Sequence, residues 1–269
     1  QNPPMKPIPR LLLFLVFLRS CFFLVFLGFC FSRSFLIFLG RSLCKSNSGK
    51  GTCDNCSDQL FHAISGEVIA TAGSEKINLG EMMHYARSVG GPALRKLTFH
   101  ERGRALRSLA QHLLANKDKY YALSAATGAT KVDSWVDIEG GAGTLFAYSG
   151  IGSNELPSGN LIHEGPAFPL GKKGGFAGTH ILVPRGGIAV HINAFNFPIW
   201  GLLEKFAPSF LAGMPCIGKP ASSTSYLTEA MVRLVEQSGI LPAGSLQLVI
   251  GSTGDLLDRL NGQDVVTFT

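Results

Sequence analysis

Residues 187–219 read GIAVHINAFNFPIWGLLEKFAPSFLAGMPCIGK, and this stretch decides the fold. The apolar run 187–192 predicts a buried strand. Residues 198–212 predict a helix, because a proline begins the segment and a glycine follows it. Residues 216–219 predict a second strand. A strand, a helix and a strand joined by short links form a right-handed crossover unit, so we expect the two strands to be parallel.

The same alternation continues along the chain. The further predicted segments are a helix at 223–238, a strand at 246–250, a helix at 253–260 and a strand at 265–268. This pattern is typical of an α/β fold, with a Rossmann-like parallel sheet and helices on both of its faces. Ligands of such sheets bind beyond the carboxyl ends of the strands. Polar or glycine-bearing loops follow those ends at 193–196, 219–222 and 251–254.

The sequence before residue 187 predicts a layer of helices and an antiparallel ribbon. Thr98, with Glu101 three residues later, forms a capping box at the start of a long helix with an apolar stripe. The other expected elements are a hairpin at 61–74, helices at 78–89, 117–126 and 134–148, and ribbon strands at 161–164 and 180–183. We expect the helix at 78–89 to end at Gly90-Gly91-Pro92.

The charge of the chain is unevenly distributed. Residues 1–57 hold seven of the 24 Lys and Arg residues but only one acidic residue, Asp54. The formal net charge of +6 therefore comes from this segment, and residues 58–269 are neutral. A neutral domain gives no support for a nucleic-acid-binding face. We divide the chain into an N-terminal segment with a linker, residues 1–57, and a main domain, residues 58–269.

The N-terminal segment contains a long apolar run. Residues 11–40 are long enough to span a bilayer, although Arg19 and Arg33 interrupt them. Three interpretations stay open: a membrane anchor, a targeting segment, or sequence that is not native to the protein, since the chain begins with Gln and its first Met is Met5. We expect the main domain to be cytoplasmic, and the protein to be membrane-bound only if residues 11–40 are native.

The cysteines indicate a reducing compartment and no metal site. Five of the six lie before residue 57, so the main domain contains only Cys216 and no internal disulfide. Cys53 and Cys56 form one CxxC pair, whereas a structural zinc site needs four ligands. We interpret Cys216 as a packed core thiol. His191 is interpreted either as a residue near the site or as a surface histidine at a strand end.

Asn196 stands between two phenylalanines, just after the first strand of the opening stretch. Asparagine is a poor strand residue. Burying its amide without a partner costs about 1–3 kcal/mol. Asn196 is therefore expected either to be hydrogen-bonded, for example to its own turn, or to be used in function.

The opening stretch and the final VVTFT resemble the nucleotide-binding domain of the aldehyde dehydrogenase superfamily. TFHERGRALRSLAQHLLANKDKYYALSAATGAT resembles the first long helices of that family. Within the family, the chain is most similar to the dehydrogenase domain of the bifunctional PaaZ-type proteins of phenylacetate breakdown. The motifs that carry this likeness are SGEVIAT, ALSAATGATKVDSWVDIEGG and HINAFNFPIWG. The resemblance covers residues 58–269 and implies the N-terminal part of the aldehyde dehydrogenase fold, truncated before the catalytic domain.

The resemblance implies NAD(P)-dependent oxidation of an aldehyde to an acid, with a CoA-linked ring-cleavage semialdehyde as substrate. It places the nucleophilic cysteine and the general-base glutamate beyond residue 269, so we expect the chain as printed to be inactive. The hydratase domain of PaaZ-type proteins is also absent. One alternative is a catalytically dead, membrane-tethered remnant; another is a dehydrogenase for a different acyl-CoA semialdehyde. The full-length protein is expected to be a homo-oligomer.

The resemblance also assigns site residues. Asn196 matches the asparagine that stabilises the oxyanion of the reacting aldehyde. The residues that match cofactor-binding positions are Ile192, Asn193, Ala194, Phe195, Lys219, Ser222 and Gly251. Ser222 stands where NAD-preferring relatives often have a glutamate that repels a 2′-phosphate. We therefore expect NADP as the cofactor, with NAD as the alternative. No G-x-G-x-x-G follows the first strand, so the nucleotide would bind without that turn.

Overall fold

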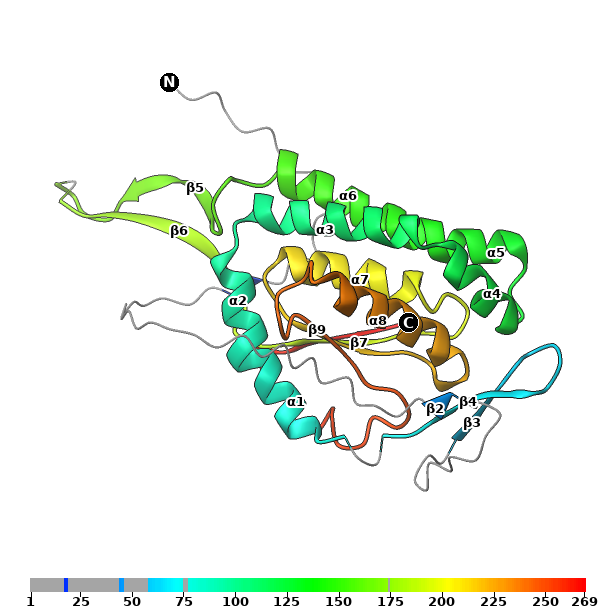
Figure 1. Ribbon diagram of the computed structural model, residues 1–269. Helices are drawn as coiled ribbons and strands as arrows, with labels where there is room; N and C mark the ends of the chain where they lie inside the picture. The colour runs from blue at the N-terminus through cyan, green and yellow to red at the C-terminus, as the bar shows by residue number, and fades with distance from the viewer. Residues whose placement is uncertain (1–16, 19–43, 46–57, 75–76, 174) are drawn as a thin grey trace.

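A computed structural model describes residues 17–18, 44–45, 58–74, 77–173 and 175–269 of the chain (Figure 1). The predicted linker at 46–57 lies outside the described residues. The apolar run 11–40 also lies outside them, apart from Phe17 and Leu18.

A four-stranded parallel sheet forms the centre of the described chain. Its strands are β7 (Ala189–Ile192), β8 (Cys216–Lys219), β9 (Leu246–Leu248) and β10 (Val265–Phe268). The spatial order is β10-β7-β8-β9, and each neighbouring pair is parallel. The predicted parallel sheet is confirmed, and β7 from the opening stretch lies between β10 and β8.

Helices cover both faces of this sheet. They are α7 (Trp200–Leu211), α8 (Ser225–Ser238), which follows the short 3-10 turn η4 (Ser222–Thr224), and α1 (Leu79–Tyr85). Ala189 belongs to the large apolar core that includes α7 and α8, whereas the next residue, Val190, packs in a second core with Met82 and Met83 of α1. This alternation is expected for a strand that is buried on both faces.

The helix predicted at 253–260 is wrong. Successive turns occupy residues 254–259. Their hydrogen bonds mostly span three residues, as from the amide of Leu256 to the carbonyl of Thr253. Gly254 has a φ of +50°, which is incompatible with a continuous right-handed helix. Leu256 is still buried in the core on the α1 side of the sheet. The apolar pattern of this segment therefore indicated burial correctly, but it did not indicate a helix.

The predicted end of the first helix at Gly90-Gly91-Pro92 is also wrong. Helix α1 continues through a π-helical segment, η2 (Ala86–Gly90), into α2 (Gly91–Lys96). Pro92 lies at the point where the π-helical segment passes into α2. Gly90 has an ordinary helical φ of −61°. Its hydrogen side chain is needed for a different reason, since a Cβ there would lie 2.1 Å from the carbonyl oxygen of Gly244.

The predicted helical layer is confirmed. Its members are α3 (Phe99–Ala115), α4 (Asp118–Ala126), α5 (Lys131–Trp135), the π-helical segment η3 (Val136–Gly140) and α6 (Gly141–Asn154). Thr98 and Glu101 form the expected capping box of α3. The run from α5 to α6 is continuous despite its glycines, and α6 packs beside α3 on top of α7 (Figure 1).

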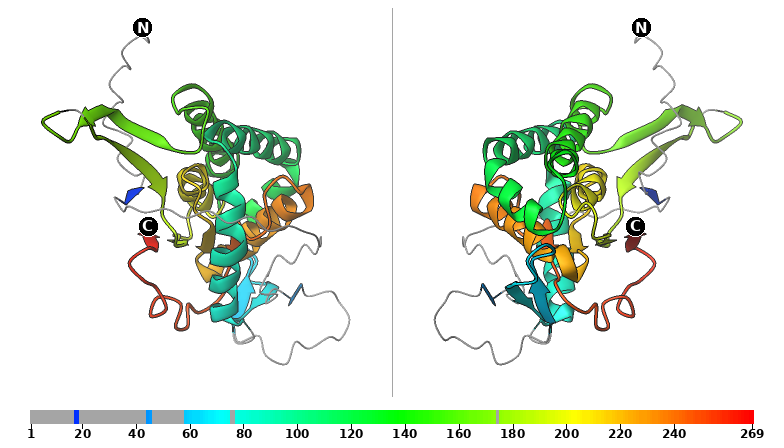
Figure 2. Two further views of the ribbon diagram at one scale, coloured as in Figure 1. Left: turned by 90° about the vertical axis from the view of Figure 1, so that its left-hand side faces the viewer. Right: turned by 90° about the vertical axis from the view of Figure 1, so that its right-hand side faces the viewer.

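Two antiparallel ribbons lie outside the sheet and the helices. One pairs β3 (Asp58–Phe61), β4 (Val68–Ala72) and β2 (Cys44–Lys45); the other pairs β5 (Ile162–Pro169), β6 (Ala177–Pro184) and β1 (Phe17–Leu18). The predicted hairpin is confirmed, although its first strand lies at 58–61, before most of the predicted range 61–74. The predicted ribbon is also confirmed, and its strands β5 and β6 are longer than expected. Figure 2 shows that the β5–β6 ribbon projects away from the body of the molecule.

Neither a membrane-spanning helix nor a metal cluster is found in the described part of the chain. None of the helices there is both long and apolar enough to cross a bilayer. No group of three or more His, Cys, Asp or Glu side chains within the described ranges could hold a metal ion. Cys53 and Cys56 lie outside these ranges.

The contact between Gly90 and Gly244 provides a test of the fold. Replacing Gly90 with Ala is expected to lower the free energy of unfolding by about 1–3 kcal/mol, because the new methyl group meets backbone that cannot yield without moving a whole loop. Gly140→Ala is the matched control, since Gly140 is also helical and a Cβ there meets no atom within 4 Å. Urea denaturation would measure both variants. Equal midpoints would show that the close approach is not tight.

Candidate active site

The carboxyl ends of β7 and β8 bring the first group of predicted residues together. Ile192 pairs with Lys219 in the register of the two strands. The amide of Asn193 donates to the carbonyl of Lys219 at 3.0 Å, and the amide of Thr269 donates to the carbonyl of Ile192 at 3.1 Å. Residues predicted from two separate loops therefore lie at one edge of the sheet.

Asn196 lies in the loop that follows β7, and it lines a cavity of about 220 Å³. The full lining is Ala194, Asn196, Phe197, Trp200, Gly201, Glu204 and Thr269. Asn196 is exposed, and among the described residues its side chain has no hydrogen-bond partner. The expected bond to its own turn is therefore not formed. The amide is instead available to a molecule in the cavity.

Asn193 is the buried amide at this edge. Its side chain is 4% exposed, and neither its Nδ2 nor its Oδ1 has a partner among the described residues. An unpaired buried amide costs free energy, so a ligand with polar groups would complete its bonding. Gly201, at the start of α7, lies close to Asn193, because a Cβ there would be 3.7 Å from the Asn193 Cβ.

Lys219 and Ser222 are placed where a nucleotide could meet them. The Lys219 ammonium is partly buried and donates to the carbonyl of Pro220 at 2.8 Å, and burial lowers its pKa. Ser222 is partly exposed and begins η4, directly before α8. Helix starts attract anions because their first N–H groups are unpaired. Ser222 offers a partly exposed hydroxyl beside the start of α8, where the N–H of Ser225 already bonds the Ser222 carbonyl.

Phe195 and Gly251 differ in their surroundings. Phe195 is 63% exposed, and its carbonyl accepts a hydrogen bond from Thr224 at 3.1 Å, which places it beside the start of α8. Gly251 is buried with a φ of +99°, and a Cβ there would lie 3.0 Å from the backbone nitrogen of Ser74. Gly251 is therefore covered by the loop that follows β4, and the other predicted residues are not gathered around it.

Asp137 contributes to the site from far away in the sequence, and the sequence analysis missed it. Its carboxylate is 2% exposed and accepts hydrogen bonds from the backbone N–H groups of Ile199, at 3.0 Å, and Trp200, at 2.7 Å. These are the first amides of α7. Burial raises the pKa of Asp137 to about 7, although the two N–H donors act in the opposite direction. The only signal in the sequence is an acidic residue inside an apolar, glycine-rich helical run.

Two hydroxyl groups hold the same loop from α8 and η4. Thr228 donates to the carbonyl of Pro198 at 2.8 Å, and Thr224 donates to that of Phe195. Both threonines are buried. No motif in the sequence marks these contacts, because they join side chains to backbone atoms about thirty residues apart.

Cys216 and His191 are structural. The Cys216 thiol is fully buried, its burial raises the thiol pKa, and Sγ lies 3.6 Å from the carbonyl of Met214. The predicted core thiol is confirmed. His191 is also fully buried, so the surface interpretation is wrong. Its Nδ1 lies 2.8 Å from the Thr267 hydroxyl, and burial, with nearby Lys205, lowers its pKa to about 3.

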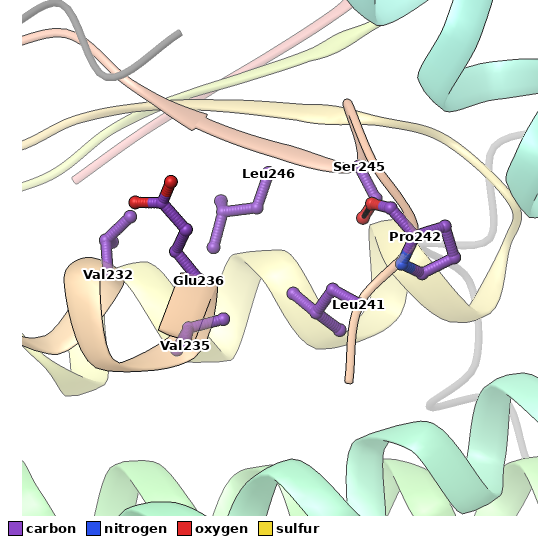
Figure 3. Close-up of a pocket in the computed structure, with 7 residues that line it drawn as sticks. All are labelled: Val232, Val235, Glu236, Leu241, Pro242, Ser245 and Leu246. Carbon is purple, nitrogen blue, oxygen red and sulfur yellow. Dashed lines mark hydrogen bonds between the residues drawn. The ribbon is translucent and has the colours of Figure 1, made fainter. Parts of the chain in front are cut away.

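A small, mostly apolar pocket lies at the opposite edge of the sheet. Figure 3 shows Val232, Val235 and Glu236 of α8 facing the segment that leads into β9. Its other lining residues are Leu241, Pro242, Ser245 and Leu246. The pocket is at the amino end of β9 and contains one carboxylate and one hydroxyl. It therefore has neither the place nor the polar groups of the site around Asn196.

Comparison with known proteins identifies the family. The aldehyde dehydrogenase family model matches residues 57–269, so the chain belongs to the aldehyde dehydrogenase family. The predicted membership is confirmed. Over 211 residues, the chain is 41% identical to the 3,4-dehydroadipyl-CoA semialdehyde dehydrogenase of Aromatoleum evansii. The aligned region covers 78% of this chain and 41% of that protein. The chain thus spans about two fifths of that relative's length.

Other relatives agree. The chain is 39% identical over 80 residues to the glutarate-semialdehyde dehydrogenase of Pseudomonas putida, covering 30% of this chain and 16% of that protein. The structure superimposes on betaine aldehyde dehydrogenase from Staphylococcus aureus in complex with NAD⁺, with a TM-score of 0.65 at 18% identity over 82% of this chain and 42% of that one. It also superimposes on succinic semialdehyde dehydrogenase from Streptococcus pyogenes in complex with NADP⁺. The TM-score is 0.62 at 22% identity, and the match covers 78% of this chain and 44% of that one. These structural likenesses confirm the predicted fold.

The raised pKa of Asp137 predicts how stability depends on pH. The folded state keeps a proton up to about pH 7, whereas the unfolded carboxyl releases it near its ordinary value of 3.8. The protonated Asp137 carboxyl therefore stabilises the folded state. This stabilisation is complete below the pKa of the unfolded carboxyl and is lost as the pH rises through about 7. The melting temperature of the wild type, relative to that of Asp137→Asn, is expected to be lower at pH 8 than at pH 6. An unchanged difference would contradict a raised pKa.

Proposed function

We propose that the protein to which this chain belongs is an NAD(P)-dependent aldehyde dehydrogenase, and that this chain supplies the nucleotide-binding part and the oxyanion asparagine. The observation that carries the proposal is the position of Asn196. Its unpaired amide lines a cavity at the edge of the sheet where Ile192, Asn193 and Lys219 meet. The fold, the family and the placement of these polar groups all support this function.

The chemistry assigned to Asn196 follows from the charge that develops during the reaction. When a thiolate adds to an aldehyde, its electron pair forms the C–S bond and the carbonyl oxygen becomes an oxyanion. A preorganised amide donor is worth roughly 3–4 kcal/mol at such a position. A nicotinamide nucleotide held by Asn193 and Lys219 would supply the acceptor for the hydride that leaves the former carbonyl carbon. Water then releases the acid from the thioester and regenerates the thiol.

Several groups of this chain fit a nicotinamide nucleotide. The buried Asn193 amide lacks a partner, and the Lys219 ammonium lies at the rim of the same edge. Ser222 adds a hydroxyl at the start of η4, directly before α8. Ala194 and Phe195 connect these groups to Asn196. We retain the cofactor-binding roles of these residues as proposals, and that of Gly251 as well, although it is buried beneath the loop that follows β4.

The nucleophile comes from another cysteine than Cys216. A fully buried thiol with a raised pKa is neither ionised nor accessible to an aldehyde. Since Cys216 is the only cysteine whose side chain the structure describes, we propose that residues 58–269 alone bind nucleotide without turning over aldehyde. The nucleophile and the general base would belong to other parts of the whole protein.

A CoA-linked semialdehyde is the substrate that we favour. The support is the identity of 41% to a dehydrogenase named for 3,4-dehydroadipyl-CoA semialdehyde. A different acyl-CoA semialdehyde is the alternative. The other alternative, a catalytically inactive product tethered to a membrane through residues 11–40, would be favoured if the full-length protein occurred only in membrane fractions and oxidised no aldehyde.

We also propose that the whole protein is a homo-oligomer. The β5–β6 ribbon projects from the body, and the loop at its tip exposes Leu170 (63%) and Phe176 (77%). Exposed apolar side chains on a projecting ribbon are suited to packing against another chain. A second copy of the protein would cover them.

Asn196→Ala tests the proposed function in the full-length protein. We expect kcat for semialdehyde oxidation to fall about 10²–10³-fold, since one oxyanion donor is removed, while nucleotide affinity changes little. Asn154→Ala, at the far end of α6, is the matched control. Steady-state kinetics with CoA-linked and CoA-free semialdehydes would measure both the role and the substrate class. An unchanged kcat in Asn196→Ala would exclude the assigned role.

The nucleotide preference is tested at Ser222. Ser222→Glu would place a carboxylate where a 2′-phosphate is proposed to bind, so we expect affinity for NADP⁺ to fall about tenfold or more while NAD⁺ is retained. Gln237→Glu adds the same charge at the exposed far end of α8 and serves as the control. Calorimetric titration of both nucleotides would decide. A wild type that binds NAD⁺ more tightly than NADP⁺ would reverse the proposed preference.

A further inference from the structure

The loop that carries Asn196 has little support from its own backbone. Among the described residues, the backbone nitrogens of residues 194–197 donate no backbone hydrogen bond, and Pro198 has no N–H to donate. The carbonyl of Phe197 accepts from Gly201, which ties only the far end of the loop to α7. The direction of the Asn196 side chain must therefore be set by groups outside the loop.

Side chains from three other elements supply that support. The Asp137 carboxylate accepts hydrogen bonds from the N–H groups of Ile199 and Trp200, at the end of the loop where α7 begins. Thr228 and Thr224 donate to the loop carbonyls of Pro198 and Phe195. The backbone is thus held by an acceptor from η3 and by donors from α8 and η4, all within four residues of Asn196.

The carboxylate reaches the loop because the helix of Asp137 approaches α7 very closely. A Cβ on Gly141 would lie 3.1 Å from the Cα of Trp200, so only glycine permits this distance without displacement. Asp137 lies in the π-helical segment directly before Gly141. Such segments insert an extra residue into a helix and are frequent at functional sites.

We propose that Asp137 is a positioning residue: its carboxylate fixes the start of α7, and thereby the loop that directs Asn196 into the cavity. The proposal rests on the proposed function, because the position of Asn196 affects catalysis only if Asn196 stabilises the oxyanion. Asp137 touches neither the cavity nor the reacting atoms, so its effect on the reaction passes through the backbone of residues 196–200.

The required property of residue 137 is an acceptor oxygen. The closest contact, 2.7 Å from the Trp200 nitrogen, uses Oδ1 alone. Asp137→Asn keeps a carbonyl oxygen at this position, whereas Asp137→Ala leaves two buried N–H groups without an acceptor. Glu139→Ala is the matched control, because Glu139 lies two residues away and bonds Lys117 and Tyr121, not the loop.

Hydrogen exchange on the full chain tests the contact without any catalytic assay. We expect the amides of Ile199 and Trp200 to exchange at least about tenfold faster in Asp137→Ala than in the wild type, because both lose their acceptor. In Asp137→Asn and Glu139→Ala these amides should exchange at the wild-type rate. The exchange rates of the β7 amides should equal those of the wild type in all three variants. Equal protection in Asp137→Ala would overturn the proposal.

Kinetics of the full-length protein test the consequence. Asp137→Ala is expected to lower kcat about tenfold or more with little change in KM for the nucleotide, and Asp137→Asn should restore most of it. In an Asn196→Ala background, Asp137→Ala should lower kcat no further, since the two residues act as one unit. The proposal would be overturned if the losses of kcat in Asp137→Ala and Asn196→Ala were fully additive. It would also be overturned if Glu139→Ala lowered kcat as much as Asp137→Ala. If the wild type oxidises no aldehyde, the proposed function fails, and hydrogen exchange alone decides whether Asp137 fixes the loop.

Discussion

The hydrogen bonds between the Asp137 carboxylate and the first amides of α7 join the helical layer to the sheet. The first N–H groups of a helix have no partner within it, and the helix dipole makes this end positive. A buried carboxylate has the opposite problem, since burial removes its water. Each group is the hydrogen-bond partner of the other, with N···O distances of 2.7–3.0 Å. The pKa of Asp137 is still raised to about 7, because burial has a larger effect than the two N–H donors. The loop between β7 and α7, and with it the cavity, depends on where this contact places the helix.

The periodic parts of the fold were predictable, because they follow from local rules. Apolar runs such as 187–192 and the capping box at Thr98 encode their elements within a few residues. Glycine was the main source of error. Gly90 reads as a helix stop, yet it permits a contact with Gly244, which lies in a distant loop. The segment 253–260 has a helical pattern, but Gly254 adopts a positive φ there. A sequence records that a glycine is present, but only the folded chain shows whether it ends an element or lets two backbones meet.

The edge of the sheet that carries the site was also predictable, because strand ends in a parallel sheet must gather there. The exposed amide of Asn196 and the pairing of Ile192 with Lys219 agree with that expectation. Asp137 and Thr228 were missed, because their partners are backbone atoms 62 and 30 residues away. Such contacts have no periodicity and no motif. The surface interpretation of His191 was wrong for a related reason: its ring is buried beside the Thr267 hydroxyl of β10, which lies 76 residues further along the chain.

The position of β10 in the sheet has a consequence for folding. The order β10-β7-β8-β9 places β10, which comes last in the sequence among these four strands, next to β7, which comes first among them. Until residues 265–269 emerge from the ribosome, β7 has one unpaired edge and the cavity lacks the wall formed by Thr269. Contacts of long sequence separation form slowly, and unpaired strand edges favour association with other chains. The site is therefore completed only after β8 and β9 have been synthesised, and a nascent chain would need protection at the β7 edge before it could receive a nucleotide.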